Sequence, residues 1–270
     1  MDHDLVELDR LSLNDESEFE INLQEIGDQK YPLLILDNLY RDPEYVRSVA
    51  LSLPTEPPKS SHPGVSSNFE SDISAQQKIV WQYVAKEFGY TADQSVSRAV
   101  FPGIAFMRIN RKAENLTIHQ CRPHADPVRI AGVVYLNLPG QCQGGTAFYR
   151  HRATGVEECV LPRNKNDPFE QQFMKLAQER GVFQSYQNYC QEMFRMPYME
   201  FIRSVLTTFP RIKNYPTDSN EDWELTRKIE MKFNRFICYP GFMIHSGYYR
   251  DEWFGDAIEE QRLTQNVFVG

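Results

Sequence analysis

His124 and Asp126 stand two residues apart in the run RPHAD, residues 122–126. Side chains two apart at the end of a strand project from one face, so this pair could supply two neighbouring ligands to one metal ion. His245 lies far downstream, in the run NRFICYPGFMIHSG, residues 234–247. Two imidazoles and one carboxylate, with other coordination positions left open, are the ligand set of non-haem Fe(II) sites.

Arg262 and Thr264 extend this chemistry, because they follow the second histidine in the last strand-like run. The planar fork of an arginine pairs bidentately with a carboxylate, and a threonine two residues on shares its strand face. A His-x-Asp pair alone is weak evidence, because a turn histidine bonded to a nearby carboxylate gives the same pattern. The surrounding sequence must therefore decide between a metal site and a structural histidine.

Short strands are the elements that should position these residues. Runs rich in strand-forming residues and bounded by Gly, Pro and Asn occur at residues 100–109, 130–138, 228–239 and 263–269, and Phe148-Tyr149 follows a Gly-Gly break. We predict that residues 97–149 form the first half of an antiparallel barrel or sandwich. Residues 31–39, YPLLILDNL, predict a further strand.

Helices are predicted in the stretches of sequence between these strands. Asp42-Pro43 is typical of a helix start, with Asp42 as N-cap, and residues 75–88 predict an amphipathic helix. The segment between them, residues 56–67, is rich in Pro, Ser and Gly and predicts a loop. Residues 163–222 predict a helical insertion with a capping box at 167–170 and a second helix from Pro197.

Composition narrows the class of protein. An apolar content of 41% supports a sizeable core. The net charge of −8, without a basic patch in the sequence, argues against a role in binding nucleic acid or membrane surfaces. Five cysteines without a Cys-x-x-Cys pair predict free thiols in a reducing cytoplasm. Residues 1–30 are polar and acidic, without a secretory signal, and predict a partly ordered segment before a single domain at 31–270.

The motifs occur in a characteristic order: HAD at 124–126, YLN at 135–137, GGTAF at 144–148, YPG at 239–241, HSG at 245–247 and RLT at 262–264. This series resembles the prolyl-4-hydroxylase-like branch of the Fe(II)/2-oxoglutarate dioxygenases. The runs NRFICYPG and RLTQ-x-x-F are similar to a bacterial family within that superfamily. The resemblance covers residues 122–270, and more loosely residues 36–43.

The resemblance implies an α+β fold with a double-stranded β-helix core, jelly-roll and cupin-like, flanked by N-terminal helices. It implies His124, Asp126 and His245 as ligands of Fe(II), with O₂ as co-reactant. It further implies that Arg262, Thr264 and Tyr135 hold the distal carboxylate of 2-oxoglutarate; a core aromatic is the alternative for Tyr135. The implied reaction is hydroxylation of an unactivated C–H bond in an amino-acid, peptide or protein substrate.

Two other functions stay open at this point. A His/Asp metal hydrolase would use the same ligands with another ion, and a jelly-roll binding module would use them without catalysis. His119 and His151 are weaker candidates for the pocket, and Arg122 and Asn137 are candidate supports of the ligands. Residues 248–255 predict a mobile loop near the mouth of the site. The helical insertion would cover the barrel mouth or form the surface of a homodimer.

Overall fold

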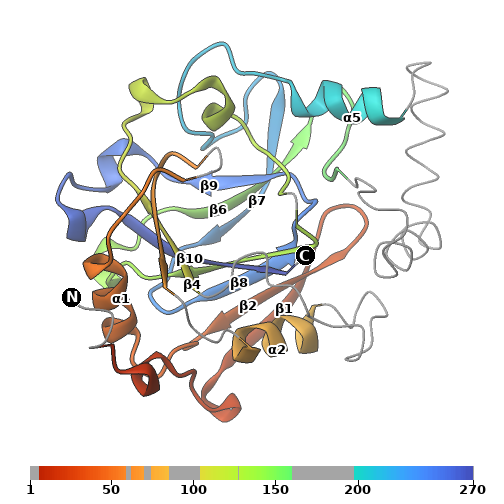
Figure 1. The fold of residues 1–270 in the computed structure, drawn as a ribbon. Coiled ribbons are helices and arrows are strands. Elements are labelled where there is room, and N and C mark those ends of the chain that lie inside the picture. The colour runs from red at the N-terminus through yellow and green to blue at the C-terminus, as the bar shows by residue number, and fades with distance from the viewer. Residues whose placement is uncertain are drawn as a thin grey trace.

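The computed structural model describes residues 6–58, 62–69, 74–84, 104–126, 128–159 and 198–269 (Figure 1). The predicted capping box at 167–170 and most of the predicted insertion therefore lie outside the described residues, as does Cys190. The other four cysteines are free thiols, as predicted. Within the described ranges, no helix has the length and apolar character needed to span a bilayer.

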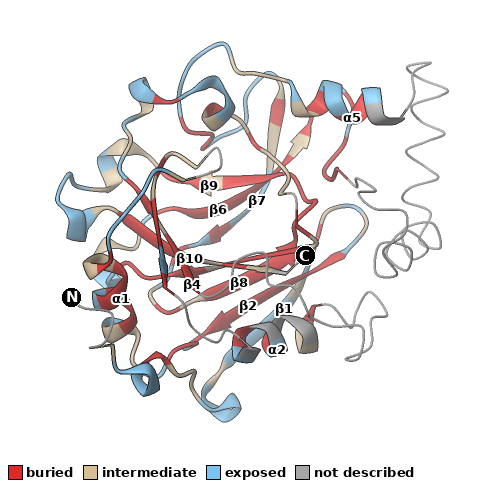
Figure 2. Ribbon diagram, in the orientation of Figure 1, coloured by how far each residue is buried: buried red, intermediate tan, exposed pale blue. Residues whose placement is uncertain are grey.

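The larger of two sheets has seven strands in the order β1-β2-β8-β5-β10-β4-β3. Every ladder in it is antiparallel. The strands are β1 (Glu20–Ile26), β2 (Tyr31–Asp37), β3 (Gly64–Phe69), β4 (Ile104–Ile109), β5 (Ile130–Tyr135), β8 (Phe236–Pro240) and β10 (Arg262–Val269). β2, β5, β8 and β10 are buried along almost their whole length (Figure 2), which explains why β2, β5 and β8 are largely apolar in sequence.

The smaller sheet has three antiparallel strands in the order β7-β6-β9. They are β6 (Gly145–His151), β7 (Trp223–Glu230) and β9 (His245–Tyr248). The two sheets meet face to face, because the ring of Phe148 on β6 packs edge-on against Tyr239 on β8, with centroids 4.9 Å apart. The fold is therefore a mostly antiparallel α+β arrangement.

Helices cover the sheets on their outer sides (Figure 1). They are α1 (Pro43–Ser52), α2 (Ser74–Tyr83) and α5 (Tyr198–Leu206). α1 begins as predicted, with the Asp42 side chain accepting from the Tyr45 amide at 3.1 Å, and its Val46 and Val49 join the core of the larger sheet. α5 packs Phe201 on the smaller sheet, in a second cluster.

Three segments differ from the sequence-based predictions. β3 begins inside the predicted loop at 56–67 and continues beyond it, and β1 lies inside the acidic segment at 1–30. Both are edge strands; β1 is mostly exposed and its sequence, EINLQEI, is largely polar, and β3, GVSSNF, contains few apolar residues. The single strand pattern at 228–239 is two strands, β7 and β8, because Asn234 adopts a left-handed φ of 63° between them.

Candidate metal centre

Three side chains that are distant in sequence converge between the two sheets. His124 follows a short 3-10 helix, η7 (Ile118–Cys121), and forms an antiparallel bridge with His245 on β9. The His124 amide donates to the His245 carbonyl at 2.8 Å, and the His245 amide donates back at 2.8 Å. The Asp126 amide donates to Gly241 O at 2.7 Å. Backbone hydrogen bonds therefore join the segments that carry His124, Asp126 and His245, which we call the triad.

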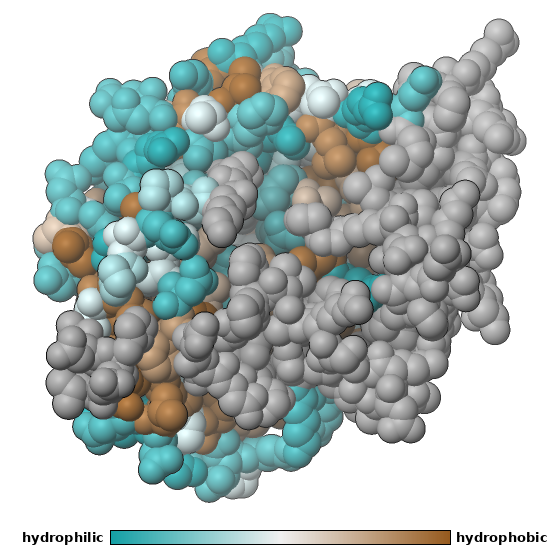
Figure 3. Space-filling view, in the orientation of Figure 1, coloured by the Kyte–Doolittle hydropathy of each residue, from teal (hydrophilic) through white to brown (hydrophobic). Residues whose placement is uncertain are grey.

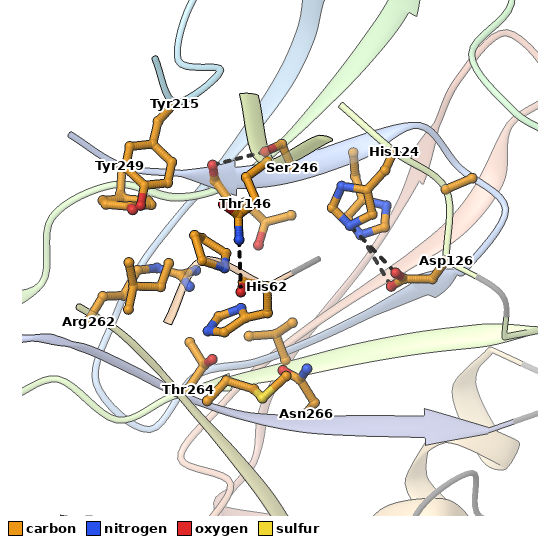
Figure 4. A pocket seen from close by; sticks show the side chains of 18 of the residues that line it. His62, His124, Asp126, Thr146, Tyr215, Ser246, Tyr249, Arg262, Thr264 and Asn266 are labelled. Carbon is orange, nitrogen blue, oxygen red and sulfur yellow. Dashed lines mark hydrogen bonds and ion pairs between the residues drawn. The ribbon is translucent and has the colours of Figure 1, made fainter. Parts of the chain in front are cut away.

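The polar atoms of the triad face one another (Figure 4). His124 Nε2 lies 3.5 Å from Asp126 Oδ1, and His245 Nε2 lies 3.4 Å from Asp126 Oδ2. Ligand atoms of all three residues lie within 4.8 Å of one another. His245 Nδ1 lies 2.9 Å from the Met243 carbonyl, so a proton on Nδ1 donates to that oxygen and leaves the Nε2 lone pair facing the triad.

Charge within the triad also favours a cation. Burial by itself raises the pKa of the Asp126 carboxyl, but His245 and His124 lower it well below its ordinary value. Burial lowers the pKa of His245, and the carboxylate of Asp126 more than offsets this, so that the pKa is raised. Asp126 is therefore an ionised carboxylate at neutral pH, held between two imidazoles.

The triad lines a cavity of about 530 Å³ between the sheets. Figure 4 shows His124 and Asp126 on one side of this cavity, and Arg262 with Tyr215 and Tyr249 on the other. Side chains two apart on β10 line it in succession, as expected for one face of a strand: Arg262, Thr264, Asn266 and Phe268. The sequence-based prediction that Arg262 and Thr264 share a face is confirmed.

Arg262 is 5% exposed, and its Nη2 donates to the Gly145 carbonyl at 3.0 Å. Its guanidinium carbon lies 5.7 Å from the centroid of the Tyr135 ring. Within the described part of the chain, no carboxylate lies within ion-pairing distance of Arg262, and its Nε has no acceptor. A buried guanidinium without an ion-pair partner favours binding of an anion, because burial of an unpaired charge is unfavourable in free energy.

Asn137 fixes Arg262 at the start of β10. The Asn137 amide nitrogen donates to the Gln261 carbonyl at 3.0 Å, and its oxygen accepts from the Leu263 amide at 2.8 Å. These two bonds hold the backbone on both sides of Arg262, and Asn137 is completely buried. The prediction that Asn137 supports the site from outside therefore has a specific structural basis.

The remaining candidates divide between the cavity and the core. His119 and Arg122 line the cavity. Tyr135 lies behind it: its hydroxyl is 2.8 Å from the Thr146 hydroxyl, and Thr146 rather than Tyr135 lines the wall. His151 does not line the cavity, because it packs against Trp223 and bonds two threonines, Thr154 and Thr208.

Two further lining residues, Tyr249 and His62, were not singled out from the sequence. Tyr249 is 3% exposed, and its hydroxyl has no hydrogen-bond partner among the described residues. Burial, together with the charge of Arg262, lowers the pKa of His62 to about 3, so this imidazole is neutral. His62 precedes β3 in a segment whose sequence resembles a loop, so the sequence does not indicate that it lies at the site. Tyr249 belongs to the aromatic run at 248–255, which the sequence does place near the mouth of the site.

One family of proteins matches the chain, over residues 17–212 and 197–269. It is described as a family of unknown function, DUF6445. The chain belongs to this family. The DUF6445 match includes both sheets, the triad and Arg262, so the site lies within the family's shared sequence. No curated protein matches the chain.

Proposed function

We propose that this protein is an Fe(II)- and 2-oxoglutarate-dependent oxygenase that hydroxylates a C–H bond of its substrate. The observation that carries the proposal is the pairing, in one cavity, of a His/Asp/His triad with a buried arginine that has no carboxylate partner in the described chain. The two facing antiparallel sheets support a double-stranded β-helix, or jelly-roll, core around that cavity.

The triad fits the metal. Two imidazole nitrogens and one carboxylate, all converging within 4.8 Å, are borderline ligands suited to Fe(II), and three protein ligands leave positions open. The Met243 carbonyl orients His245, which keeps its Nε2 toward the ion. His124, Asp126 and His245 would therefore hold Fe(II) without rearrangement of their backbone, because bridge bonds already join the segments that carry them.

The opposite side of the cavity fits a carboxylate. Arg262 offers its guanidinium, Thr264 lies beside it on the same strand face, and the buried Tyr249 hydroxyl lacks a partner in the described part. These three groups would hold the distal carboxylate of 2-oxoglutarate, which would point its other end toward the triad. We assign the tyrosine contact to Tyr249, because the hydroxyl of Tyr135 is already paired with Thr146.

Bound Fe(II) with 2-oxoglutarate and O₂ would supply the oxidising power for hydroxylation, with succinate and CO₂ as co-products. The chain contributes position and exclusion of water. Val133, Tyr239 and Phe268 contribute apolar surface to the lining of the cavity, which favours a dry reaction site. The neutral His62 adds no charge to these walls at neutral pH. A metal hydrolase, in contrast, would have no use for the buried arginine.

The deciding experiment is anaerobic addition of Fe(II) and 2-oxoglutarate to the full chain. We expect a visible metal-to-ligand charge-transfer band, which requires both the metal and the chelated cosubstrate. The band should disappear in His124→Ala, and in Arg262→Gln it should require at least about 10-fold more 2-oxoglutarate, since a hydrogen bond to a charged group contributes about 1.5–3 kcal/mol.

Arg152→Gln is the matched control, because Arg152 is exposed and bonds only a backbone carbonyl of Asn220 in the described chain. Aerobic succinate production is the second readout. Absence of the band from the wild-type protein, or metal-dependent hydrolysis without succinate, would exclude the oxygenase.

A further inference from the structure

Arg122 is a second arginine in the same cavity, and it lies near the opening. It lines the cavity together with His119, which is exposed and therefore marks the mouth. Both residues contact one ring: Phe209 lies 5.1 Å from the His119 ring, and its centroid is 5.4 Å from the Arg122 guanidinium carbon. Phe209 follows α5, so the described end of the predicted insertion reaches the mouth of the site.

The interactions of Arg122 hold its position but do not neutralise its charge. Its Nη1 donates to the Pro123 carbonyl at 3.2 Å, and the Phe209 ring supports one face of the guanidinium. Its buried Nε has no acceptor among the described residues. No carboxylate of the described chain pairs with Arg122, so no structural ion pair accounts for it.

The charge of the cavity also requires an anion. Among its described lining residues, Arg122 and Arg262 are cationic and Asp126 is the single acidic group. The lining thus carries one net positive charge; a divalent ion adds two, and the two carboxylates of 2-oxoglutarate remove two. One positive charge remains in the cavity, although the chain as a whole carries a net charge of −8. The described surface in Figure 3 is, by contrast, largely hydrophilic.

We propose that Arg122 binds a carboxylate of the substrate, so that the substrate class is small carboxylic acids, free amino acids included. This inference rests on the proposed oxygenase function and adds the substrate to it. Arg122 is two residues from His124, so a carboxylate bound there keeps the neighbouring carbons close to the triad. A planar guanidinium pairs bidentately with one carboxylate, and also with a phosphate, so phosphate is the competing ligand in the test.

The test is calorimetric binding of a paired panel to the full chain with Fe(II) and 2-oxoglutarate under argon, where no turnover occurs. Each small carboxylic acid or L-amino acid is paired with its primary amide, and inorganic phosphate is included. We expect at least one acid to bind about 10- to 100-fold more tightly than its amide, as expected for a hydrogen bond to a charged group.

Variants separate the two arginines. Arg122→Gln should remove the preference for the acid and leave the 2-oxoglutarate affinity unchanged, and Arg122→Lys should restore part of the preference. Arg262→Gln should do the reverse by weakening 2-oxoglutarate alone. Arg203→Gln, on an exposed position of α5, is the control for loss of one charge.

The inference is overturned if no acid in the panel binds, if amides bind as well as acids, or if Arg122→Gln leaves the preference intact. Phosphate binding tighter than every acid, and dependent on Arg122, would also overturn the assigned class. If the oxygenase proposal is wrong, the wild-type protein will not bind 2-oxoglutarate, and this outcome is distinct from those of the panel.

Discussion

Arg262 shows how single residues of this chain are prepared for a ligand. One nitrogen of its guanidinium is fixed by Gly145, and the Tyr135 ring lies near its carbon. Burial lowers its pKa, and the nearby phenols of Tyr135, Tyr239 and Tyr215 partly offset this effect. An arginine remains charged even so. The residue therefore carries an uncompensated charge at a fixed place, which favours a bound carboxylate.

At this scale we predict a specific role for Tyr249. Tyr249→Phe should weaken 2-oxoglutarate binding by about 10-fold or more, because it removes a hydrogen bond to a charged carboxylate. Titration of the anaerobic charge-transfer band measures the change. Tyr215→Phe is the matched control: its ring lies 3.7 Å from that of Tyr249, but its hydroxyl donates to Arg111 O. Equal effects of both changes would contradict the assignment.

The chemistry of the site was more predictable than its details. The resemblance of the motifs led us to expect His124, Asp126 and His245 close together, and the shared face of Arg262 and Thr264 follows from strand geometry. The position of Tyr135 behind Thr146 does not, because a period of two gives the face of a residue but not the neighbour that covers it. His62 was not predicted either, since its place beside the site depends on the pairing of β3 with β4.

At the scale of secondary structure, two strands carry His245 and Arg262, whereas His124 and Asp126 lie in the segment after η7. β10 lies between β5 and β4 and presents one whole face to the cavity, and β9 presents His245 from the smaller sheet. The start of β10 pairs with β4 on one side, and on the side of β5 the side chain of Asn137 holds it. The position of Arg262 therefore depends on one buried amide that never touches the ligand.

We expect Asn137→Ala to lower the free energy of unfolding by about 2–4 kcal/mol, because it leaves two buried backbone groups without partners. It should also weaken 2-oxoglutarate binding, although Asn137 does not line the cavity. Urea unfolding and the charge-transfer titration measure the two effects. Asn137→Asp is the informative control, since it keeps the acceptor for Leu263 and loses the donor to Gln261; wild-type affinity in Asn137→Ala would refute the positioning role.

Buried strands were predictable and edge strands were not. The runs that became β2 and β5 are almost continuously apolar, and the start of α1 follows from Asp42 and Pro43. β1 and β3 have polar sequences because one side of each faces no strand, so only pairing with a neighbour makes them strands. Propensity alone could not reveal this pairing.

The whole molecule is held together by contacts that join its first strands to its last. Asp37 at the end of β2 accepts from Arg235 Nε at 2.6 Å and from Lys232 Nζ at 2.7 Å, both in the turn between β7 and β8. Burial by itself raises the pKa of Asp37, but Arg235 and Lys232 lower it below its ordinary value. The N-terminal part is thus tied to the region that carries the second histidine.

This pairing predicts part of the acid sensitivity of the fold. A folded pKa below the unfolded value means that the unfolded chain binds more protons, so the contribution is complete above about pH 4 and is lost as the pH falls through the folded pKa. Asp37→Asn should lower the free energy of unfolding at pH 7 by about 1–3 kcal/mol and remove this acid-dependent part.

Urea unfolding between pH 7 and pH 3 measures the difference between the two proteins, which should shrink at low pH. Asp15→Asn is the control, because Asp15 makes an exposed pair with Arg41 at 3.5 Å and should have little effect. A difference that stays constant over this pH range would show that protonation of Asp37 is not involved.

The backbone bridge between His124 and His245 also determines when the ligands can first meet. The long stretch of chain between them must be closed into a loop, and this costs entropy that only late, non-local contacts repay. An ion arriving earlier would meet separated imidazoles. Under the proposed function, we therefore expect Fe(II) to bind only after folding, to an apoprotein whose ligand segments are already joined.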